Sequence, residues 1–285
     1  MFTASGAAAQ VGWYGAVDLG YHWPESFEAT SSANAANGSP YTWDFNSEDD
    51  WAGFARLGYQ LNDNWRVELE LGYRGGDLES VRGGSTNSVV GLCTPGVVRT
   101  AAAPTCNAPD GDLTSWTVMG NVLYDFLPGS TVNPFVGAGI GINHVSMEAL
   151  GQFSNIPGTP PFTAASGPAI QNLAIDDDDT AFAWQLIAGL AWRATDRLNV
   201  DLTYRYLGGS EVDFASTGTN TLQPGVFSGE YRDQSVTVGL RYSFAPPPPP
   251  PPPPAAPAAP AASPAAAASA AAGHGSPAVH RLLPV

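Results

Sequence analysis

The stretch Asp233–Phe244, which reads DQSVTVGLRYSF, decides the fold of this chain. Its apolar side chains alternate with small or charged ones at the two-residue period of a β-strand. The apolar set is Val236, Val238, Leu240, Tyr242 and Phe244, and the opposite set is Ser235, Thr237, Gly239, Arg241 and Ser243. We therefore predict that one face of this strand meets hydrocarbon and that the other does not.

The strand is predicted to end on its last aromatic residue, Phe244. Ala245 follows, and then nine consecutive prolines, Pro246–Pro254. Proline has no backbone N–H to donate to a sheet ladder, so the proline run cannot extend the strand. We interpret residues 246–254 as a polyproline linker, which would span about 28 Å in the polyproline II conformation.

The composition narrows the class of protein. Of the 285 residues, 44% are hydrophobic and 13% are charged, which is a low charge content for a soluble domain, and there is no Lys. The formal net charge of −15 argues against nucleic-acid binding, because phosphate contacts need clustered cations. Most of the 26 acidic residues fall in the long connections between predicted strands, so we expect the charge on hydrated surface loops.

Two features of the sequence restrict how the chain could be exported and inserted into a membrane: the lengths of its apolar runs and its N-terminal residues. No run of eighteen apolar residues exists, which excludes a membrane-spanning helix but not a closed sheet. Residues 1–10 contain no Arg, and Ala7, Ala8 and Ala9 look like the small-residue end of a secretory signal. We interpret residues 1–10 as a signal-peptide remnant or a disordered N-terminus, with the natural start of the chain upstream.

Seven further segments repeat the alternation of Asp233–Phe244. They are Gly12–Trp23, Trp51–Leu61, Trp65–Arg74, Leu113–Phe126, Val132–Met147, Thr180–Ala194 and Leu198–Leu207. Each has about ten residues or slightly more, the length that a tilted strand needs to cross hydrocarbon. Their connections alternate between tight turns and long irregular segments, and the long ones are Pro24–Asp50, Gly75–Asp112, Glu148–Asp179 and Gly208–Arg232.

This order predicts an all-β fold over residues 11–245: an eight-stranded antiparallel up-and-down transmembrane β-barrel with short periplasmic turns and long extracellular loops. Aromatic residues on the apolar face near the strand ends fit two girdles at lipid–water interfaces. They are Trp13, Tyr21, Trp51, Trp65, Tyr73, Tyr124, Trp184, Trp192, Tyr204, Tyr206 and Tyr242. The alternative, a soluble ligand-carrying barrel, would expose a face of Gly and Ala to water, and the absence of Lys fits it badly.

The face opposite the apolar one is predicted to fill the lumen. An eight-stranded barrel is just wide enough to be filled by side chains, and an isolated ion inside it is costly. The charged residues assigned to this lumen network are Asp18, Arg56, Arg66, Glu68, Glu70, Asp125, Arg193, Asp201, Arg205 and Arg241. Pairing among them predicts a plugged, salt-bridged core, and the alternative is a set of water-exposed lumen residues.

The eight alternating strands, the final Arg241-Tyr242-Ser243-Phe244 and the proline run together resemble the OmpA-like outer-membrane proteins of Gram-negative bacteria, in particular their N-terminal barrel. The resemblance implies contact with outer-membrane lipid and lipopolysaccharide, and insertion by the barrel-assembly machinery through the last strand. In that family the hinge leads to a periplasmic domain that binds peptidoglycan. Residues 255–285 are instead of low complexity, rich in Ala, Pro and Ser, and we expect them to be disordered. A peptidoglycan tether is expected only if a C-terminal domain exists.

Little in the sequence predicts chemistry. Cys93 and Cys106 share one extracellular connection, and a disulfide between them, favoured over two free thiols, would stabilise by about 3 kcal/mol in the chain-entropy description. Asp176–Asp179 lacks the spaced ligands and turn glycines of a calcium loop, so we expect solvated charge there. His22 is the one inward-pointing His near an outer strand end, where a lipid A-modifying enzyme would need one.

We therefore predict no catalytic residue, no cofactor and no metal, and a chain that is not an enzyme. The predicted function is that of a structural outer-membrane barrel that supports the envelope and carries acidic surface loops. Two alternatives remain open: a narrow porin-like channel for small solutes, and an adhesin or ligand-binding surface protein.

Overall fold

The computed structural model describes residues 11–35, 38–83, 91–96, 107–154, 170–219 and 222–245. The chain divides into two compact units, Met1–Pro248 and Pro249–Val285, and every described residue belongs to the first. The predicted N-terminal segment, the proline linker and the low-complexity tail lie outside the described residues. No helix long and apolar enough to cross a membrane occurs in the described part of the chain.

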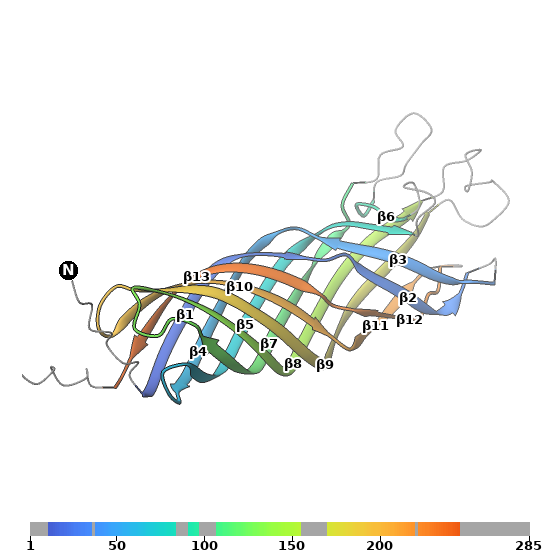
Figure 1. Cartoon of the computed structure of the whole chain (residues 1–285). Helices are drawn as coiled ribbons and strands as arrows, with labels where there is room; N and C mark the ends of the chain where they lie inside the picture. The colour runs from blue at the N-terminus through green and yellow to red at the C-terminus, as the bar shows by residue number, and fades with distance from the viewer. Residues whose placement is uncertain are drawn as a thin grey trace, which may run out of the picture. The chain divides into compact units, whose positions relative to one another are not determined.

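The described chain is all-β, as predicted, and its strands pair antiparallel (Figure 1). Thirteen strands are assigned where the sequence predicted eight. They are β1 Gly12–Pro24, β2 Phe27–Asn34, β3 Pro40–Ser47, β4 Asp50–Gln60, β5 Trp65–Gly83, β6 Gly91–Leu92, β7 Asp110–Asp125, β8 Val132–Ser154, β9 Ile170–Arg193, β10 Leu198–Gly209, β11 Glu211–Gly218, β12 Val226–Glu230 and β13 Asp233–Ser243.

The eight predicted segments form a closed ring of ladders. The ring runs from β1 through β4, β5, β7, β8, β9, β10 and β13, and β13 pairs with β1 again. Closure leaves no unpaired edge, which is the condition that hydrocarbon imposes on a sheet. We call the residues of the predicted segments the membrane ring. Both described ends of the chain lie at the end of the ring that carries the tight turns (Figure 1).

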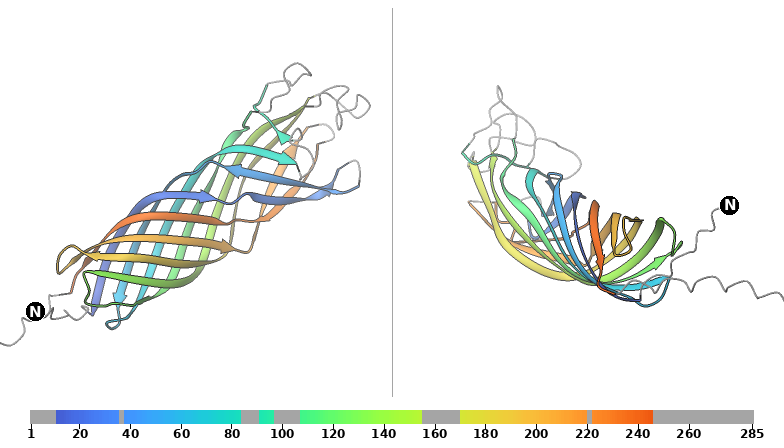
Figure 2. Two further views of the ribbon diagram at one scale, coloured as in Figure 1. Left: turned by 45° about the horizontal axis from the view of Figure 1, so that its top comes forward. Right: turned by 90° about the vertical axis from the view of Figure 1, so that its left-hand side faces the viewer.

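The described parts of the four long connections are largely strand, so the prediction of irregular structure was wrong for those parts. β5, β8 and β9 continue well beyond the predicted segments, and β2, β3, β6, β11 and β12 complete the wall beside them (Figure 2). β2 pairs with β3 and β12, β3 with β5, and β11 with β12 and β9. β6 pairs with β5, and Cys93 after it bridges to Gln152 of β8. We call this continuation the outer ring.

The predicted orientation of the membrane ring is confirmed. Val238 and Phe244 are each 57% exposed on the outer face of the wall, whereas Arg66 is 0% and Arg241 is 8% exposed. A barrel in water would show the reverse, because its apolar side chains would fill the interior. The membrane ring is therefore built for an apolar surrounding.

Aromatic side chains gather at both rims of the membrane ring. Near the tight turns the ring centroids of Trp65 and Tyr124 lie 5.0 Å apart. Near the outer ring Tyr73 lies 5.0 Å from Trp51 and 4.7 Å from Trp116. Aromatic rings with polar tips favour the level of lipid headgroups, so the two belts mark the two interfaces.

Candidate functional site: two layers that fill the lumen

Buried ion pairs fill the membrane ring, and Arg56 of β4 lies at their centre. Its Nε and Nη2 each lie 2.7 Å from an oxygen of Asp18 in β1, which makes a two-pronged pair. Its Nη1 lies 3.1 Å from Glu68 Oε1 of β5, and Nη2 lies 3.1 Å from Asp201 Oδ2 of β10. Strand alternation points all these side chains inward, and the ion pairs offset the cost of removing the charges from water.

Two further arginines tie more strands into this ionic layer. Arg205 of β10 donates to Asp18 at 2.8 Å and, through Nε, to Glu70 at 3.0 Å. Arg241 of β13 lies 3.1 Å from the carboxylate of Asp201. The contacts of Arg205 link β10 to β1 and β5, with which it does not pair, so they join the wall across its interior. Arg241 and Asp201 lie on the paired strands β13 and β10.

Toward the tight turns the ionic layer ends on Arg66. Its guanidinium lies 3.3 Å from Glu68 Oε1 and 3.3 Å from Asp125 Oδ2, and it stacks on the ring of Phe135 with 4.5 Å to the ring centroid. Arg193 does not join the network, contrary to the prediction. It lies half-buried near the rim, where its Nη1 is 3.5 Å from the carbonyl of Gly129. The position at a strand end, beside a turn, puts it out of reach of the lumen acids.

The glycines of the inner face make room for these side chains. A Cβ at Gly239 of β13 would collide with the carboxylate of Asp18, and a Cβ at Gly58 of β4 would collide with the ring of Tyr14. Tyr14 donates its hydroxyl to Glu68 Oε1 at 2.7 Å. Tyr14 is neutral and was not among the predicted lumen charges, although it has the same strand parity as Asp18, which places it inside.

A second polar cluster was missed and lies at the outer end of the ionic layer. Asp233 of β13 forms an ion pair with Arg74, whose Nε lies 2.8 Å from Oδ1, and its Oδ2 lies 2.7 Å from His22 Nδ1. The other ring nitrogen of His22 lies 3.0 Å from the carbonyl of Gly75, an atom that can only accept. Both nitrogens of His22 are thus occupied by structural contacts, which leaves neither for the acid–base role that its position had raised.

An apolar layer takes over where the polar clusters end. It fills the outer ring and includes Met119, Ala183 and Leu207 of the membrane ring. Edge-to-face aromatic contacts dominate it: the centroid of Phe27 lies 6.1 Å from that of Phe45 and 5.7 Å from that of Phe214. The ring of Trp43 stacks on that of Phe227 at 5.3 Å.

Tyr231, between β12 and β13, joins the two layers. Its ring belongs to the apolar layer, while its hydroxyl meets Asp233. Burial, reinforced by the negative charge of Asp233, raises the pKa of the phenol well above its ordinary value. The hydroxyl therefore stays protonated and remains a donor for the Asp233 carboxylate.

The remaining predicted residues lie apart from these layers. Phe244 follows β13 and donates its N–H to the carbonyl of Trp13 at 2.9 Å. Cys93 is buried in the outer ring, and since Cys106 lies outside the described residues, their disulfide stays a prediction. Asp176–Asp179 lies within β9 and not in a loop. The described residues contain no group of three or more side chains that could hold a metal ion.

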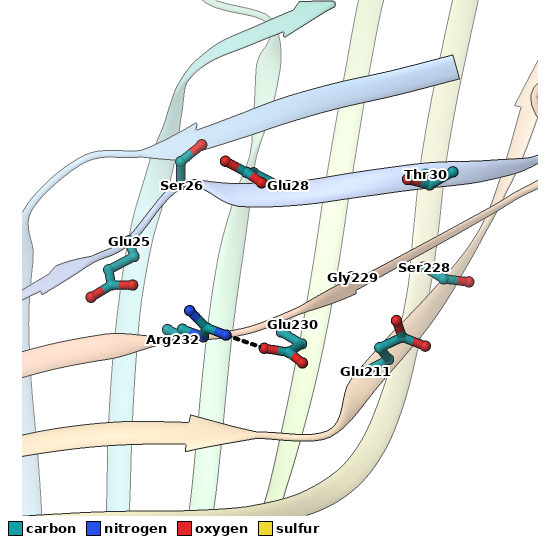
Figure 3. A pocket seen from close by; sticks show the side chains of 9 residues that line it. All are labelled: Glu25, Ser26, Glu28, Thr30, Glu211, Ser228, Gly229, Glu230 and Arg232. Atoms are coloured by element: carbon teal, nitrogen blue, oxygen red, sulfur yellow. Dashed lines mark hydrogen bonds and ion pairs between the residues drawn. The ribbon is translucent and has the colours of Figure 1, made fainter. Parts of the chain in front are cut away.

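A hollow of about 370 Å³ opens on the outer face of the wall, above the membrane ring. Glu25, Glu28, Glu211 and Glu230 supply its carboxylates, and Arg232 supplies its cation, paired with Glu230 (Figure 3). Ser26, Thr30, Ser228 and Gly229 complete its lining. Carboxylates alone do not identify a ligand, so we assign none to this hollow.

The two layers lie in series along the barrel axis and have opposite chemistry. A solute that traversed the ionic layer would have to separate paired charges, and an ion in the apolar layer would lose its water without gaining a partner. The arrangement is suited to keeping the lumen closed and the wall rigid.

A match to a family model agrees with this architecture. Residues 1–244 match the family model described as an outer membrane protein beta-barrel domain. An uncharacterized protein of Brucella suis biovar 1 is 25% identical over 263 residues, which cover 83% of this chain and 86% of that protein. Among solved structures, OprG from Pseudomonas aeruginosa is 13% identical, with 82% of this chain and 97% of that chain covered and a TM-score of 0.47. Neisserial surface protein A is 16% identical, with 83% and 99% covered and a TM-score of 0.42.

Proposed function

The chain belongs to the outer membrane protein beta-barrel domain family, and from that premise we propose that it is a closed barrel with a structural role in the envelope. The family places it in the outer membrane of a Gram-negative cell, and it is a family of membrane barrels and not of enzymes. The resemblance to OmpA-like proteins is confirmed at the level of this family, and the narrower OmpA-like assignment stays a prediction.

The proposal rests on one observation: an ionic layer and an apolar layer follow each other along the lumen, and both are filled by side chains. Arg56, Arg66 and Arg205 are buried among carboxylates in the membrane ring, and Phe27, Phe45 and Phe214 are buried among apolar side chains above them. Cross-lumen ion pairs hold opposite walls at a set distance, as a structural barrel requires. A pore would need a continuous hydrated path through both layers.

Conductance of the purified barrel in planar lipid bilayers tests the proposal. We expect no steady open state for the natural protein. Arg56→Ala alone and Phe214→Ala alone should also stay closed, because each leaves one layer intact. Heat-resistant migration on gels shows whether each variant is folded. A large, steady conductance of the natural protein would exclude a closed barrel.

A narrow channel for small solutes is the second candidate, and one feature favours it. Several buried polar atoms have no hydrogen-bond partner among the described residues, including Arg66 Nη2, Arg74 Nη2 and Thr203 Oγ1. Ordered water commonly satisfies such atoms, and connected waters would carry protons or small molecules through the ionic layer. This candidate requires that the apolar layer parts as well, so brief openings that vanish when the apolar layer is overpacked would support it.

We also propose partners for the outer surfaces. Outer-membrane lipid and lipopolysaccharide would surround the membrane ring. The barrel-assembly machinery would act on β13, the last strand. A peptidoglycan tether would need a C-terminal domain. Cross-linking of the barrel in native outer membranes, followed by mass spectrometry, tests each of these contacts.

A further inference from the structure

The wall of the outer ring is interrupted between β9 and β11. β10 pairs with β9 as far as Gly209 opposite Ala183, and the N–H of Ser210 still donates to the carbonyl of Phe182 at 2.9 Å. The β9–β11 ladder resumes only at Ser216 opposite Ile175 and covers three residue pairs. Over residues 176–181 and 211–215, all of them described, the two strands share no ladder pair.

Two aspartate side chains bridge this gap. Asp179 Oδ2 accepts the backbone N–H of Asp213 at 3.0 Å, and Asp177 Oδ2 accepts that of Ala215 at 2.7 Å. The second oxygen of each carboxylate accepts an N–H of its own strand: Asp177 Oδ1 from Asp178 at 3.0 Å and Asp179 Oδ1 from Thr180 at 2.7 Å. Each carboxylate therefore takes the place of a main-chain carbonyl in joining the strands.

The two bridging residues belong to the inward-pointing set of β9. Ile175 and Ala183, of the same parity, are fully buried, whereas Asp177 and Asp179 are only half-buried. Asp176 and Asp178, of the opposite parity, point outward and are exposed. The side chains that close the wall are thus within reach of solvent, unlike the carbonyls of a buried ladder.

The apolar layer lies directly behind the gap. Val212 and Phe214 of β11 alternate with Asp213 and Ala215. Val212 and Phe214 are buried in the apolar layer. If β11 moved away from β9, these two side chains would be uncovered. The bonds to Asp177 and Asp179 thus protect the apolar layer from water at this place.

We propose that residues 176–181 and 211–215 form a carboxylate-clamped seam, the line along which the outer ring opens. Hydrogen bonds to a carboxylate are stronger than neutral ones, so the clamp holds β11 in place. It is also local, since it depends on two side chains and not on a continuous ladder. Loss of the two carboxylates should therefore free β11 without unfolding the membrane ring.

Amide hydrogen exchange, followed by NMR on the full chain in lipid nanodiscs, tests the seam. In Asp177→Ala/Asp179→Ala, the amides of Asp213 and Ala215 should exchange at least about tenfold faster, since each loses a charge-assisted hydrogen bond. Amides of β9 that pair with β10 should keep their protection, which shows that the membrane ring is folded.

The chain offers a matched control in the same acidic run. Asp176→Ala/Asp178→Ala removes the same number of charges from the same strand, but these exposed side chains form no hydrogen bond or ion pair with the described residues of β11. The exposed pair between Asp178 and His144 spans 3.8 Å. The seam amides of this control should exchange within about twofold of the natural rate. Asp177→Asn/Asp179→Asn keeps the shape and should give an intermediate rate. Equal acceleration in both alanine pairs, or none in either, would overturn the proposal; if Asp177→Ala/Asp179→Ala does not fold, the asparagine pair decides in the same way.

Discussion

Val238 of β13 and Phe227 of β12 lie on consecutive strands of one wall, yet Val238 is 57% exposed and Phe227 is 0% exposed. Val238 belongs to the membrane ring, which is apolar outside and ionic inside. Phe227 belongs to the outer ring, which is polar outside and apolar inside. The barrel wall continues from one ring to the other, but its polarity inverts where the second aromatic belt marks the end of the hydrocarbon.

The inversion follows from what surrounds each ring. In water, burying apolar side chains is the main favourable contribution to folding, so the outer ring has an apolar interior. In hydrocarbon, turning apolar side chains inward brings no such gain, and the interior is free to hold paired charges. The two rings therefore should respond differently to the same kind of substitution.

The largest effect is expected inside the membrane ring. Arg56→Ala leaves three buried carboxylates without their central cation, and breaking a buried pair in this way costs about 3–5 kcal/mol. Arg193→Ala removes the same side chain from outside the network and should cost less than about 1 kcal/mol. The free energy of unfolding in urea, measured in lipid vesicles, gives both values. Similar losses would mean that the ionic layer contributes no more than a surface arginine.

The second-largest difference between the two rings is expected when a charge is added to the outer face of the wall. Val238→Arg puts a cation near the middle of the hydrocarbon and should cost about 2–4 kcal/mol. Thr42→Arg puts the same side chain on the exposed outer face of β3, in water, and should change the free energy of unfolding by less than about 0.5 kcal/mol. Both are read from urea unfolding in vesicles. A large loss for Thr42→Arg would show that hydrocarbon extends over the outer ring.

A smaller difference should distinguish the two apolar surfaces. Leu173→Ala in the apolar layer loses transfer free energy and leaves a cavity, at a cost of about 3–4 kcal/mol. Leu190→Ala on the lipid-facing side loses only the transfer part, about 2 kcal/mol, because lipid chains refill the space. The difference of about 1–2 kcal/mol measures the cavity. Equal losses would indicate that the apolar layer relaxes as freely as lipid.

The smallest effect concerns acid on the outer face. Burial, together with the charge of Asp77 on the adjacent strand, raises the pKa of Asp112 above its ordinary value. A carboxyl whose pKa is raised on folding imposes no penalty at low pH and destabilises the fold as pH rises through the raised pKa. Asp112→Asn should therefore be slightly more stable than the natural protein at pH 7, and the gain should vanish below the ordinary pKa of Asp, about 3.9.

The free energy of unfolding of Asp112→Asn and of the natural protein, measured at pH 7 and at pH 3, checks the direction of this change. Glu79→Gln, which removes an exposed carboxylate from the same ring, serves as the control for a general loss of negative charge. An Asp112→Asn variant that is less stable at pH 7 would contradict the expectation.

The membrane ring was predicted well because its pattern is strictly local. Strand alternation in Asp233–Phe244 already places Val238 outside and Arg241 inside. The outer ring was missed because several of its inward positions carry small or polar side chains. The buried positions of β2 are Phe27, Ala29 and Ser31, so its alternation contains one large apolar side chain and does not stand out in the sequence.

The lumen network, too, was predicted only in the part that depends on local strand alternation. Nine of the ten predicted charged residues lie among the buried side chains, and Arg193 does not. Parity along a strand was enough to place the others inside. It could not show that Arg74 and His22 meet at Asp233, since these contacts join β5, β1 and β13 across the lumen.

The order of the residues alone therefore settled which side chains face lipid, where the tight turns fall and that charges fill the lumen, because each of these depends on alternation within one strand. The partners of each charge, the apolar layer and the gap bridged by Asp177 and Asp179 emerged only once the strands were assembled. Asp18 and Arg205 are 187 residues apart, and closing the sheet is what brings them within 2.8 Å. Contacts of that kind depend on register and closure, which no local period of the sequence records.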